Sequence, residues 1–292
     1  MLKRLIPSLL VLAAACSPSA PSVAETALAA PAIQLDCFRE TGAAMLAAHR
    51  AGPAPGYPEN ALSTLRRLAD LGALYAEIDV RRSADGVLFL LHDDTLDRTT
   101  TGAGSLDGLA WGTLSGTTLR DPDGTIVEDT IPTLADALTV AREASLVLNL
   151  DLKSVSPEEI VGFVHEHDAR DEVAIIAYSV DQAAAIHALD DGLLLSAPND
   201  PAALQAAGAN LEAVYIWTGV GAADADQDAR LAEAGLETSA GLFRLENGDP
   251  AVYQAAAAAG VELLSIDDVD TAVVALGGAD VLQAQIAACI VD

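Results

Sequence analysis

The stretch "AAHRAGPAPGYPENALSTLRRLADLGALYAEIDVRRSADGVLFLLHDDTLDRTTTGAG", residues 47 to 104, carries the pattern that decides the fold. A short apolar run ends at His49, a helix-like segment follows, and a second apolar run covers residues 75 to 80. Glu77 and Asp79 lie inside the second run, and His92 ends a third run, "VLFLLH". Strand and helix patterns therefore alternate here, and polar residues stand where the apolar runs end.

The same alternation continues to the end of the chain and predicts an α/β fold. Since each predicted strand is followed by an Ala- and Leu-rich helical segment, we expect a (β/α)8 TIM barrel. A Rossmann-like sheet is the main competitor, but no Gly-x-Gly-x-x-Gly follows an early strand. The eight expected strands are Met45–Ala48, Tyr75–Val80, Leu146–Leu152, Val173–Tyr178, Leu193–Ser196, Ala213–Trp217, Glu237–Leu242 and Leu263–Ile266.

Two local features refine this prediction. In "NALSTLRRLADLG" the leucines lie on one helical face, Asn60 is the expected N-cap and Gly72 the expected end. Residues 94 to 130 are rich in Gly, Thr and Asp and have no helical period, which predicts a small insertion after the second strand. Trp111 in this insertion could cover a substrate or pack the insertion onto the barrel, and packing is the favoured interpretation.

Composition excludes some classes of function. The 292 residues include 43 acidic and 15 basic side chains, a net charge of −28. A protein that binds nucleic acid should be basic, so none is expected as a partner. Most of the acidity is best explained by solubility or adaptation to salt. No protein partner is expected.

The N-terminus has the pattern of a bacterial export signal. Lys3 and Arg4 precede a short apolar run, which is typical of a signal peptide and too short to span a membrane stably. The segment resembles a lipoprotein signal, with Cys16 as the lipidated residue, although Ala13 stands where that signal most often has Leu. We expect residues 1–16 to be the signal, residues 17–36 a flexible tether, and the protein to be lipid-anchored on the periplasmic side of a bacterial membrane. The lipid would be its only contact with the membrane.

Two further cysteines, Cys37 and Cys289, lie before the first predicted strand and before the chain end. The ends of a closed barrel come close together, and disulfides persist in exported proteins. A Cys37–Cys289 disulfide and two buried free thiols remain equally weighted alternatives.

The polar residues at the strand ends predict a catalytic site, because the carboxyl ends of barrel strands form the mouth where active sites lie. Glu77 and Asp79 have i, i+2 spacing, and so have Asp151 and Lys153 near the end of "LVLNLDLKS". Carboxylates packed closely repel each other and need a cation, and oxygen ligands favour Mg²⁺ or Ca²⁺ over zinc. His49 and His92 would remain free for proton transfer.

This set of segments resembles the glycerophosphodiester phosphodiesterase family. The family pattern runs His-Arg-Gly, Pro-Glu-Asn-Thr, Glu-x-Asp-Val, Thr-x-Asp-Gly, His-Asp and Arg-Thr-Thr-x-Gly-x-Gly. This chain has "HRAG", "PENA", "EIDV", "SADG" and "HDDTLDRTTTGAG" in the same order. The resemblance is sharp over residues 45–104 and looser to the end, so residues 37–292 would form the phosphodiesterase domain.

The resemblance implies roles for individual residues. His49 and His92 match the family's acid/base pair, and Arg50 and Lys153 match residues near the substrate phosphate. Glu77 and Asp79 match two metal ligands, and Asp151 stands where the family usually has a third acidic ligand, Glu. The chain departs from the pattern at Ala51, Ala61 and "ETSAGLF", which stands in place of a Trp-Thr-Val-Asn strand. This last departure leaves the head-group preference open.

The expected function is hydrolysis of glycerophosphodiesters to sn-glycerol 3-phosphate and an alcohol, with one divalent cation, Ca²⁺ or Mg²⁺, as cofactor. A phosphodiester resists attack by water, and a cation together with fixed positive charge offsets the negative charge of its transition state. Two alternatives remain, a phospholipase-like barrel enzyme that releases a cyclic phosphate and a solute-binding lipoprotein without catalysis. An apolar lip at the barrel mouth would favour the phospholipase.

Overall fold

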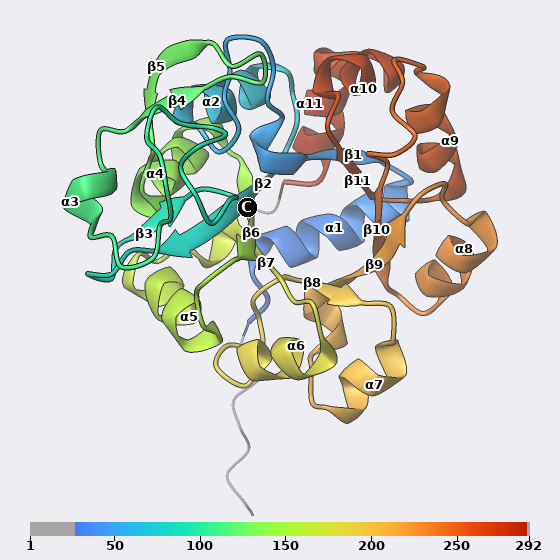
Figure 1. Ribbon diagram of the computed structural model, residues 1–292. Helices are drawn as coiled ribbons and strands as arrows, with labels where there is room; N and C mark the ends of the chain where they lie inside the picture. The colour runs from blue at the N-terminus through green and yellow to red at the C-terminus, as the bar shows by residue number, and fades with distance from the viewer. Residues whose placement is uncertain (1–26, 291–292) are drawn as a thin grey trace, which may run out of the picture.

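The chain folds into a closed barrel of parallel strands with helices around it, as Figure 1 shows. A computed structural model describes residues 27–290. Within these residues the strand order β1-β11-β10-β9-β8-β7-β6-β2 is closed by pairing of β1 with β2. The predicted (β/α)8 TIM barrel is confirmed. Its strands are β1 (Met45–Ala48), β2 (Tyr75–Arg82), β6 (Val147–Leu152), β7 (Val173–Ile176), β8 (Leu195–Pro198), β9 (Val214–Val220), β10 (Glu237–Gly241) and β11 (Leu263–Ile266).

The helices form the outer layer and are placed by local capping signals. Thr133 and Asp136 form a capping box at the start of α4, and Ser156 and Glu159 form another at the start of α5. Among residues 27–290 no single helix is long and apolar enough to cross a bilayer. Helices α10 and α11 have sufficient length and apolarity only when taken together, and they are bent by 73° relative to each other. The barrel helices are α2 (Leu62–Asp70), α4 (Leu134–Ala144), α5 (Pro157–Glu166), α6 (Val180–His187), α7 (Pro201–Ala206), α8 (Ala225–Glu233), α9 (Ala251–Ala259), α10 (Val269–Ala275) and α11 (Ala279–Ala288). Short 3-10 turns are η1 (His49–Ala51), η2 (Arg170–Glu172) and η3 (Leu211–Ala213).

The prediction that Asn60 caps α2 is wrong. The helix begins at Leu62, its N-cap residue is Ala61, and no side chain caps it. Asn60 has a left-handed backbone, with φ of 58°, and its side chain binds Asp79 instead. Asn60 therefore orients a carboxylate at the barrel mouth and does not cap the helix that follows it.

The predicted insertion is present after the second barrel strand. It follows β3 (Leu88–Leu90), which pairs antiparallel with β2, and contains α3 (Trp111–Leu114) and the hairpin of β4 (Thr118–Arg120) and β5 (Ile126–Thr130). It has a small hydrophobic cluster of its own, separate from the barrel core. Trp111 packs against this cluster, with its ring centroid 5.9 Å from that of Phe89, so packing is the role that the structure gives it.

The segment before the barrel is more ordered than a tether. Helix α1 (Ala30–Thr41) lies across the end of the barrel where the strands begin, with Leu35 and Phe38 fully buried. The N–H of Ala29 donates to the carbonyl of Gly192 at 2.9 Å. The predicted tether boundary at residue 36 is therefore wrong, because apolar residues of α1 close the barrel core. The signal, Cys16 and the first part of the predicted tether lie outside the described residues.

Cys37 and Cys289 lie together at this end of the molecule. Cys37 is on α1 and Cys289 is the C-cap residue of α11, and their sulfurs are bonded with the Cα atoms 5.7 Å apart. The bond joins positions 252 residues apart. It thereby ties the helix that closes the barrel to the end of the chain.

Loss of this bond should destabilise the fold. In the chain-entropy account, closing so long a loop stabilises the folded state by about 5–6 kcal/mol, because it restricts the unfolded chain. Replacing both cysteines, Cys37→Ser with Cys289→Ser, should lower the free energy of unfolding in urea accordingly. Reductant should lower the urea midpoint of the parent and leave that of the variant unchanged. Equal midpoints for the oxidised parent and the variant would contradict a stabilising disulfide.

Candidate active site

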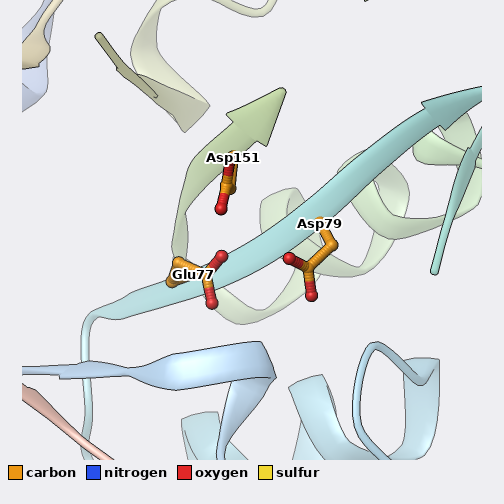
Figure 2. Close-up of side chains that lie close together, drawn as sticks. All are labelled: Glu77, Asp79 and Asp151. Atoms are coloured by element: carbon orange, nitrogen blue, oxygen red, sulfur yellow. The ribbon is translucent and has the colours of Figure 1, made fainter. Parts of the chain in front are cut away.

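Three buried carboxylates meet at the mouth of the barrel, as Figure 2 shows. Glu77 and Asp79 come from β2, and Asp151 comes from β6. Asp79 and Asp151 stand opposite each other in the pairing of the two strands. One oxygen of each carboxylate lies within 4.8 Å of one from each of the others. Side chains at i and i+2 of a strand point to one face, which is why this sequence spacing gives this cluster.

Neighbouring polar groups hold the two β2 carboxylates in place. The backbone N–H of Arg50 donates to Glu77 Oε2 at 2.7 Å. Asn60 binds Asp79 twice: its amide Nδ2 donates to Asp79 Oδ2 at 2.7 Å, and its Oδ1 accepts from the Asp79 N–H at 2.9 Å. The loop between β1 and α2 therefore orients both carboxylates of the second strand.

The loop after β1 takes a strained backbone to do this. Arg50 and Ala51 both have left-handed conformations, with φ of 51° and 68°. For a residue with a Cβ this costs about 1–2 kcal/mol. The departure from the family motif at Ala51 thus places an alanine where the backbone favours glycine. Strain of this kind is typical of functional sites, and here it aims the Arg50 N–H at Glu77.

The third carboxylate is shared by an ammonium and a phenol. Lys153 Nζ lies 2.6 Å from Asp151 Oδ2 and 3.0 Å from Asp79 Oδ1. The Tyr178 hydroxyl donates to Asp151 Oδ2 at 2.7 Å. Burial alone would lower the pKa of Lys153, but its hydrogen bond to Asp151 and the charges of Asp79 and Asp151 outweigh burial and raise it. Lys153 therefore stays protonated and offsets part of the negative charge.

The cluster still carries more negative charge than its neighbours neutralise. Burial, followed by the charge of Asp79, raises the pKa of Glu77 to about 8. Within residues 27–290, Asp151 Oδ1 has no hydrogen-bond partner, and Asp79 Oδ1 meets only Lys153, outside hydrogen-bonding geometry. A set of three carboxylates with free oxygens fits a hard divalent cation such as Ca²⁺ or Mg²⁺.

His49 follows β1 and is fixed by a carboxylate that follows the neighbouring strand, β11. Its Nδ1 lies 2.8 Å from Asp267 Oδ1, and its ring lies 4.8 Å from that of Phe243. Burial would lower the pKa of His49, but the hydrogen bond to Asp267 and the charges of Glu77 and Asp267 outweigh it and raise the pKa. With Nδ1 engaged, Nε2 is the ring nitrogen that has no partner in the described part of the chain.

His92 is held in the same manner, through a chain of ion pairs. Its Nδ1 lies 2.7 Å from Asp93 Oδ1. Arg98, on the insertion, binds Asp93 with two hydrogen bonds of 2.7 and 2.8 Å and Glu59 with two of the same lengths. Glu59 also accepts from Arg50 Nη1 at 3.2 Å. Arg98 holds the pKa of Asp93 well below its usual range, so this carboxylate remains ionised beside His92.

A cavity of about 380 Å³ opens beside the carboxylates. Glu77, Asp151 and His49 line it, whereas His92, Arg50 and Lys153 are not among its lining residues. Its other walls carry the aromatic residues Tyr178, Tyr215, Trp217 and Phe243. Arg50, Lys153 and the three carboxylates therefore form one cluster, and His92 stands beside it on the segment that leads into the insertion.

Several residues of the site were not predicted from the sequence. Asn60 was assigned to the helix, and Glu59, Asp93 and Arg98 lie in the motifs used for the resemblance but were given no role. Asp267 and Tyr178 follow the last and the fourth barrel strands. The rule that found Asp151, a polar residue at a strand end, would have identified both of these.

The sequence model described as "Glycerophosphoryl diester phosphodiesterase family" matches residues 49–265. Glycerophosphodiester phosphodiesterase 1 of Mus musculus is 36% identical over 112 residues, 36% of this chain and 33% of the relative. A glycerophosphodiester phosphodiesterase of Caldanaerobacter subterraneus is 29% identical over 145 residues, 46% of this chain and 58% of the relative. The chain thus spans between a third and three fifths of the length of these curated relatives.

Solved structures share the fold. A glycerophosphoryl diester phosphodiesterase from Parabacteroides distasonis superposes with a TM-score of 0.76 at 23% identity, covering 91% of this chain and 94% of that one. An Oleispira antarctica phosphodiesterase, solved with the product sn-glycerol-3-phosphate, gives a TM-score of 0.64 at 23% identity, covering 82% and 98%.

The partner of His49 should be visible in its titration. Asp267→Asn keeps an acceptor oxygen but removes the negative charge that favours the imidazolium, so the pKa of His49 should fall. NMR titration of the histidine ring protons in the metal-free protein would measure this shift. His165, which lies 2.8 Å from Asp190, provides an internal control that should not change. An unchanged His49 titration would contradict the assignment of Asp267.

Proposed function

This chain belongs to the glycerophosphoryl diester phosphodiesterase family, and we propose that it hydrolyses glycerophosphodiesters to sn-glycerol 3-phosphate and an alcohol. The observation that carries the proposal is the cluster of three buried carboxylates with a lysine, beside two histidines that are each bound to a carboxylate. The Oleispira relative solved with sn-glycerol-3-phosphate supports this choice of product.

The cofactor in this proposal is one divalent cation, Ca²⁺ or Mg²⁺, held by Glu77, Asp79 and Asp151. Such an ion would offset the charge of a phosphoryl oxygen as the transition state forms. Lys153 contacts the same carboxylates and places a further positive charge next to them. The Arg50 guanidinium lies 4.0 Å from Asp79 Oδ2, and its Nε has no hydrogen-bond partner in the described part of the chain. This unpaired donor supports the role in binding the substrate phosphate that the family resemblance implies for Arg50.

The two histidines transfer the protons of the reaction. One accepts a proton from the nucleophile and the other donates a proton to the leaving alkoxide. If the nucleophile is water, sn-glycerol 3-phosphate forms directly. If it is a neighbouring glycerol hydroxyl, a cyclic phosphate forms first, and water then opens the ring to give sn-glycerol 3-phosphate. Asp267 and Asp93 bind Nδ1 of His49 and His92, so each ring is held with Nε2 available. His49 lines the cavity and would contact the substrate from within. His92 would act from the side of the insertion.

A second candidate is a phospholipase-like reaction on lysophospholipids. It is favoured by the aromatic residues Tyr178, Trp217 and Phe243 on the cavity wall, since an apolar lip was the feature expected of such an enzyme. Tyr178 is 66% exposed and would offer its ring to an acyl chain at the mouth. A solute-binding protein without catalysis is disfavoured, because each expected acid, base and histidine is present.

We also propose export and a lipid anchor at Cys16. The basic head and apolar run support export, and the Cys37–Cys289 bond is of the kind that persists in oxidising compartments. Cys16→Ser should release the protein into the soluble fraction or block its processing. Membrane retention of a processed Cys16→Ser protein would contradict the anchor.

Phosphorus NMR of the full chain tests the reaction directly. With glycerophosphocholine, glycerophosphoethanolamine and one lysophospholipid in the mixture, the two glycerophosphodiester signals should decay and the signal of sn-glycerol 3-phosphate should grow. A chelator should stop the reaction because the carboxylates need the cation to act on phosphate. His92→Ala should lower turnover by about 10²-fold or more without loss of the fold.

The outcomes separate the candidates. Consumption of the lysophospholipid alone, or a cyclic phosphate as the final product, would support the phospholipase-like reaction. No consumption of any diester with either cation would contradict a hydrolase. A folded His92→Ala protein with normal turnover would remove His92 from the mechanism.

A further inference from the structure

The loop between β10 and α9 contacts both His49 and the segment that carries its partner, Asp267. Phe243, in the turn that follows β10, has its ring 4.8 Å from the ring of His49. Three residues further along, Glu246 binds the segment between β11 and α10, where Asp267 lies. The loop begins in "ETSAGLF", the stretch at which the chain departs from the family pattern. Its role at His49 therefore has to be derived from its own contacts.

Asp267 holds His49 with a carboxylate that has few contacts of its own. Its Oδ1 lies 2.8 Å from His49 Nδ1, and 52% of its side chain is exposed. In the described part of the chain, His49 is the one partner that this carboxylate binds. Only Asp267 and Asp268 separate β11 from α10, so the backbone of these two residues determines where the carboxylate lies. A group that fixes this backbone also fixes the ring of His49.

Glu246 binds this backbone directly. The N–H of Asp267 donates to both oxygens of Glu246, at 3.1 Å to Oε1 and 2.9 Å to Oε2. The N–H of Asp268 donates to Oε1 at 3.3 Å. Hydrogen bonds from N–H groups to a carboxylate are stronger than those between neutral groups. Glu246 thus engages both peptide N–H groups that lie between the strand and the helix.

A buried tyrosine holds Glu246 in turn. Tyr253, on α9, is fully buried in the hydrophobic core, and its hydroxyl lies 3.0 Å from Glu246 Oε1. The same hydroxyl lies 3.4 Å from the carbonyl oxygen of Asp268. Because the ring of Tyr253 is packed on all sides, its hydroxyl is a rigid point of attachment for the carboxylate. A chain of contacts therefore runs from the core through Tyr253, Glu246 and Asp267 to His49.

These hydrogen bonds act against a repulsion between like charges. Among residues 27–290, no ion pair joins Lys or Arg to Glu246, Asp267 or Asp268, and Arg67 in the adjoining groove is paired with Asp270 at 2.5 Å. Burial raises the pKa of Glu246, the N–H groups of Asp267 and Asp268 lower it, and the charge of Asp267 raises it. The two N–H groups therefore offset a repulsion that would otherwise move Asp267 away from Glu246.

We propose that Glu246 is a positioning residue for His49: it fixes the backbone of Asp267, and Asp267 keeps the proton of the neutral ring on Nδ1 and leaves Nε2 free. This inference rests on the proposed function, in which His49 transfers a proton. Glu246 does not line the cavity beside the three carboxylates, so it acts through Asp267 and not by contact with the substrate. The bond made at one ring nitrogen decides which nitrogen of a histidine carries the proton.

Nitrogen NMR of the metal-free, full-length protein labelled at histidine tests this role without catalysis. Above the pKa of the ring, the two ring nitrogens differ in chemical shift, and the parent should carry the His49 proton on Nδ1. Asp267→Ala should remove this preference, and Glu246→Ala should shift the His49 signals in the same direction. Glu246→Gln should shift them less, because its carbonyl oxygen can still accept from Asp268 and Tyr253 while its amide nitrogen faces the Asp267 N–H.

Turnover of glycerophosphocholine provides a second readout. Glu246→Ala should lower kcat about tenfold, less than the loss of about 10²-fold expected on removal of a histidine, and should leave KM nearly unchanged. In a protein that already carries Asp267→Ala, the further change Glu246→Ala should have little effect on kcat. Residues that act through one another have effects that do not add.

Asp224 provides a matched control. It lies in the loop after β9, the strand next to β10, and its Oδ1 accepts from the N–H groups of Asp226 and Gln227, both at 3.1 Å. Asp224→Ala therefore removes the same kind of bond from a neighbouring loop, and it should leave the His49 signals and kcat unchanged. If Glu246→Ala does not fold, Tyr253→Phe keeps the buried ring, removes one donor from Glu246 and should shift the His49 signals in the same direction.

The outcomes separate this inference from the proposed function. Unchanged His49 signals in Glu246→Ala, equal effects of Glu246→Ala and Asp224→Ala on kcat, or additive effects of Glu246→Ala and Asp267→Ala would each overturn it. If the signals shift as expected but the parent hydrolyses no diester, Glu246 still positions the ring and the hydrolase proposal fails. If the parent hydrolyses diesters and Glu246→Ala keeps both the signals and the turnover of the parent, the hydrolase proposal stands and this inference fails.

Discussion

The repulsion among Glu77, Asp79 and Asp151 is the constraint on which the rest of the site depends. Three carboxylates that are almost fully buried and within 4.8 Å of each other cannot all be ionised unless positive charge or hydrogen-bond donors face them. Neighbouring segments supply some of this: the loop between β1 and α2 gives the Arg50 N–H and the Asn60 amide, and the residue after β6 is Lys153. Burial, followed by the charge of Asp79, raises the pKa of Glu77 to about 8, and a cation among the three carboxylates would favour its ionised form.

The barrel and its insertion contribute different parts of this arrangement. The strands fix the carboxylates, since their positions follow from strand pairing and from the alternation of side chains. The insertion fixes the surroundings, because Arg98 joins Asp93, which holds His92, to Glu59, which contacts Arg50. The insertion therefore helps to hold His92 and Arg50 in place, through the contacts of Arg98.

The sequence predicted the parts of the structure that follow from periodicity. Eight strands, the insertion and the cluster of Glu77, Asp79 and Asp151 could be derived because strand spacing and the carboxyl ends of barrel strands place them. The role of Asn60 could not be predicted, because an Asn just before a helix has the same sequence pattern whether it caps the helix or hydrogen-bonds a carboxylate on another element. The order of residues 30–36 was missed because an Ala-rich segment after a signal resembles a tether.

Binding of the cation tests the central claim most directly. Calorimetric titration of the metal-free, full-length protein with Ca²⁺ and with Mg²⁺ should give one site for at least one ion. Asp151→Asn, which removes a charge at nearly constant volume, should weaken that site, while Asp270→Asn at an exposed ion pair with Arg67 should leave it unchanged. If the parent binds neither ion, or if Asp151→Asn binds them as the parent does, the three carboxylates do not form the metal site and the account of the barrel mouth is wrong.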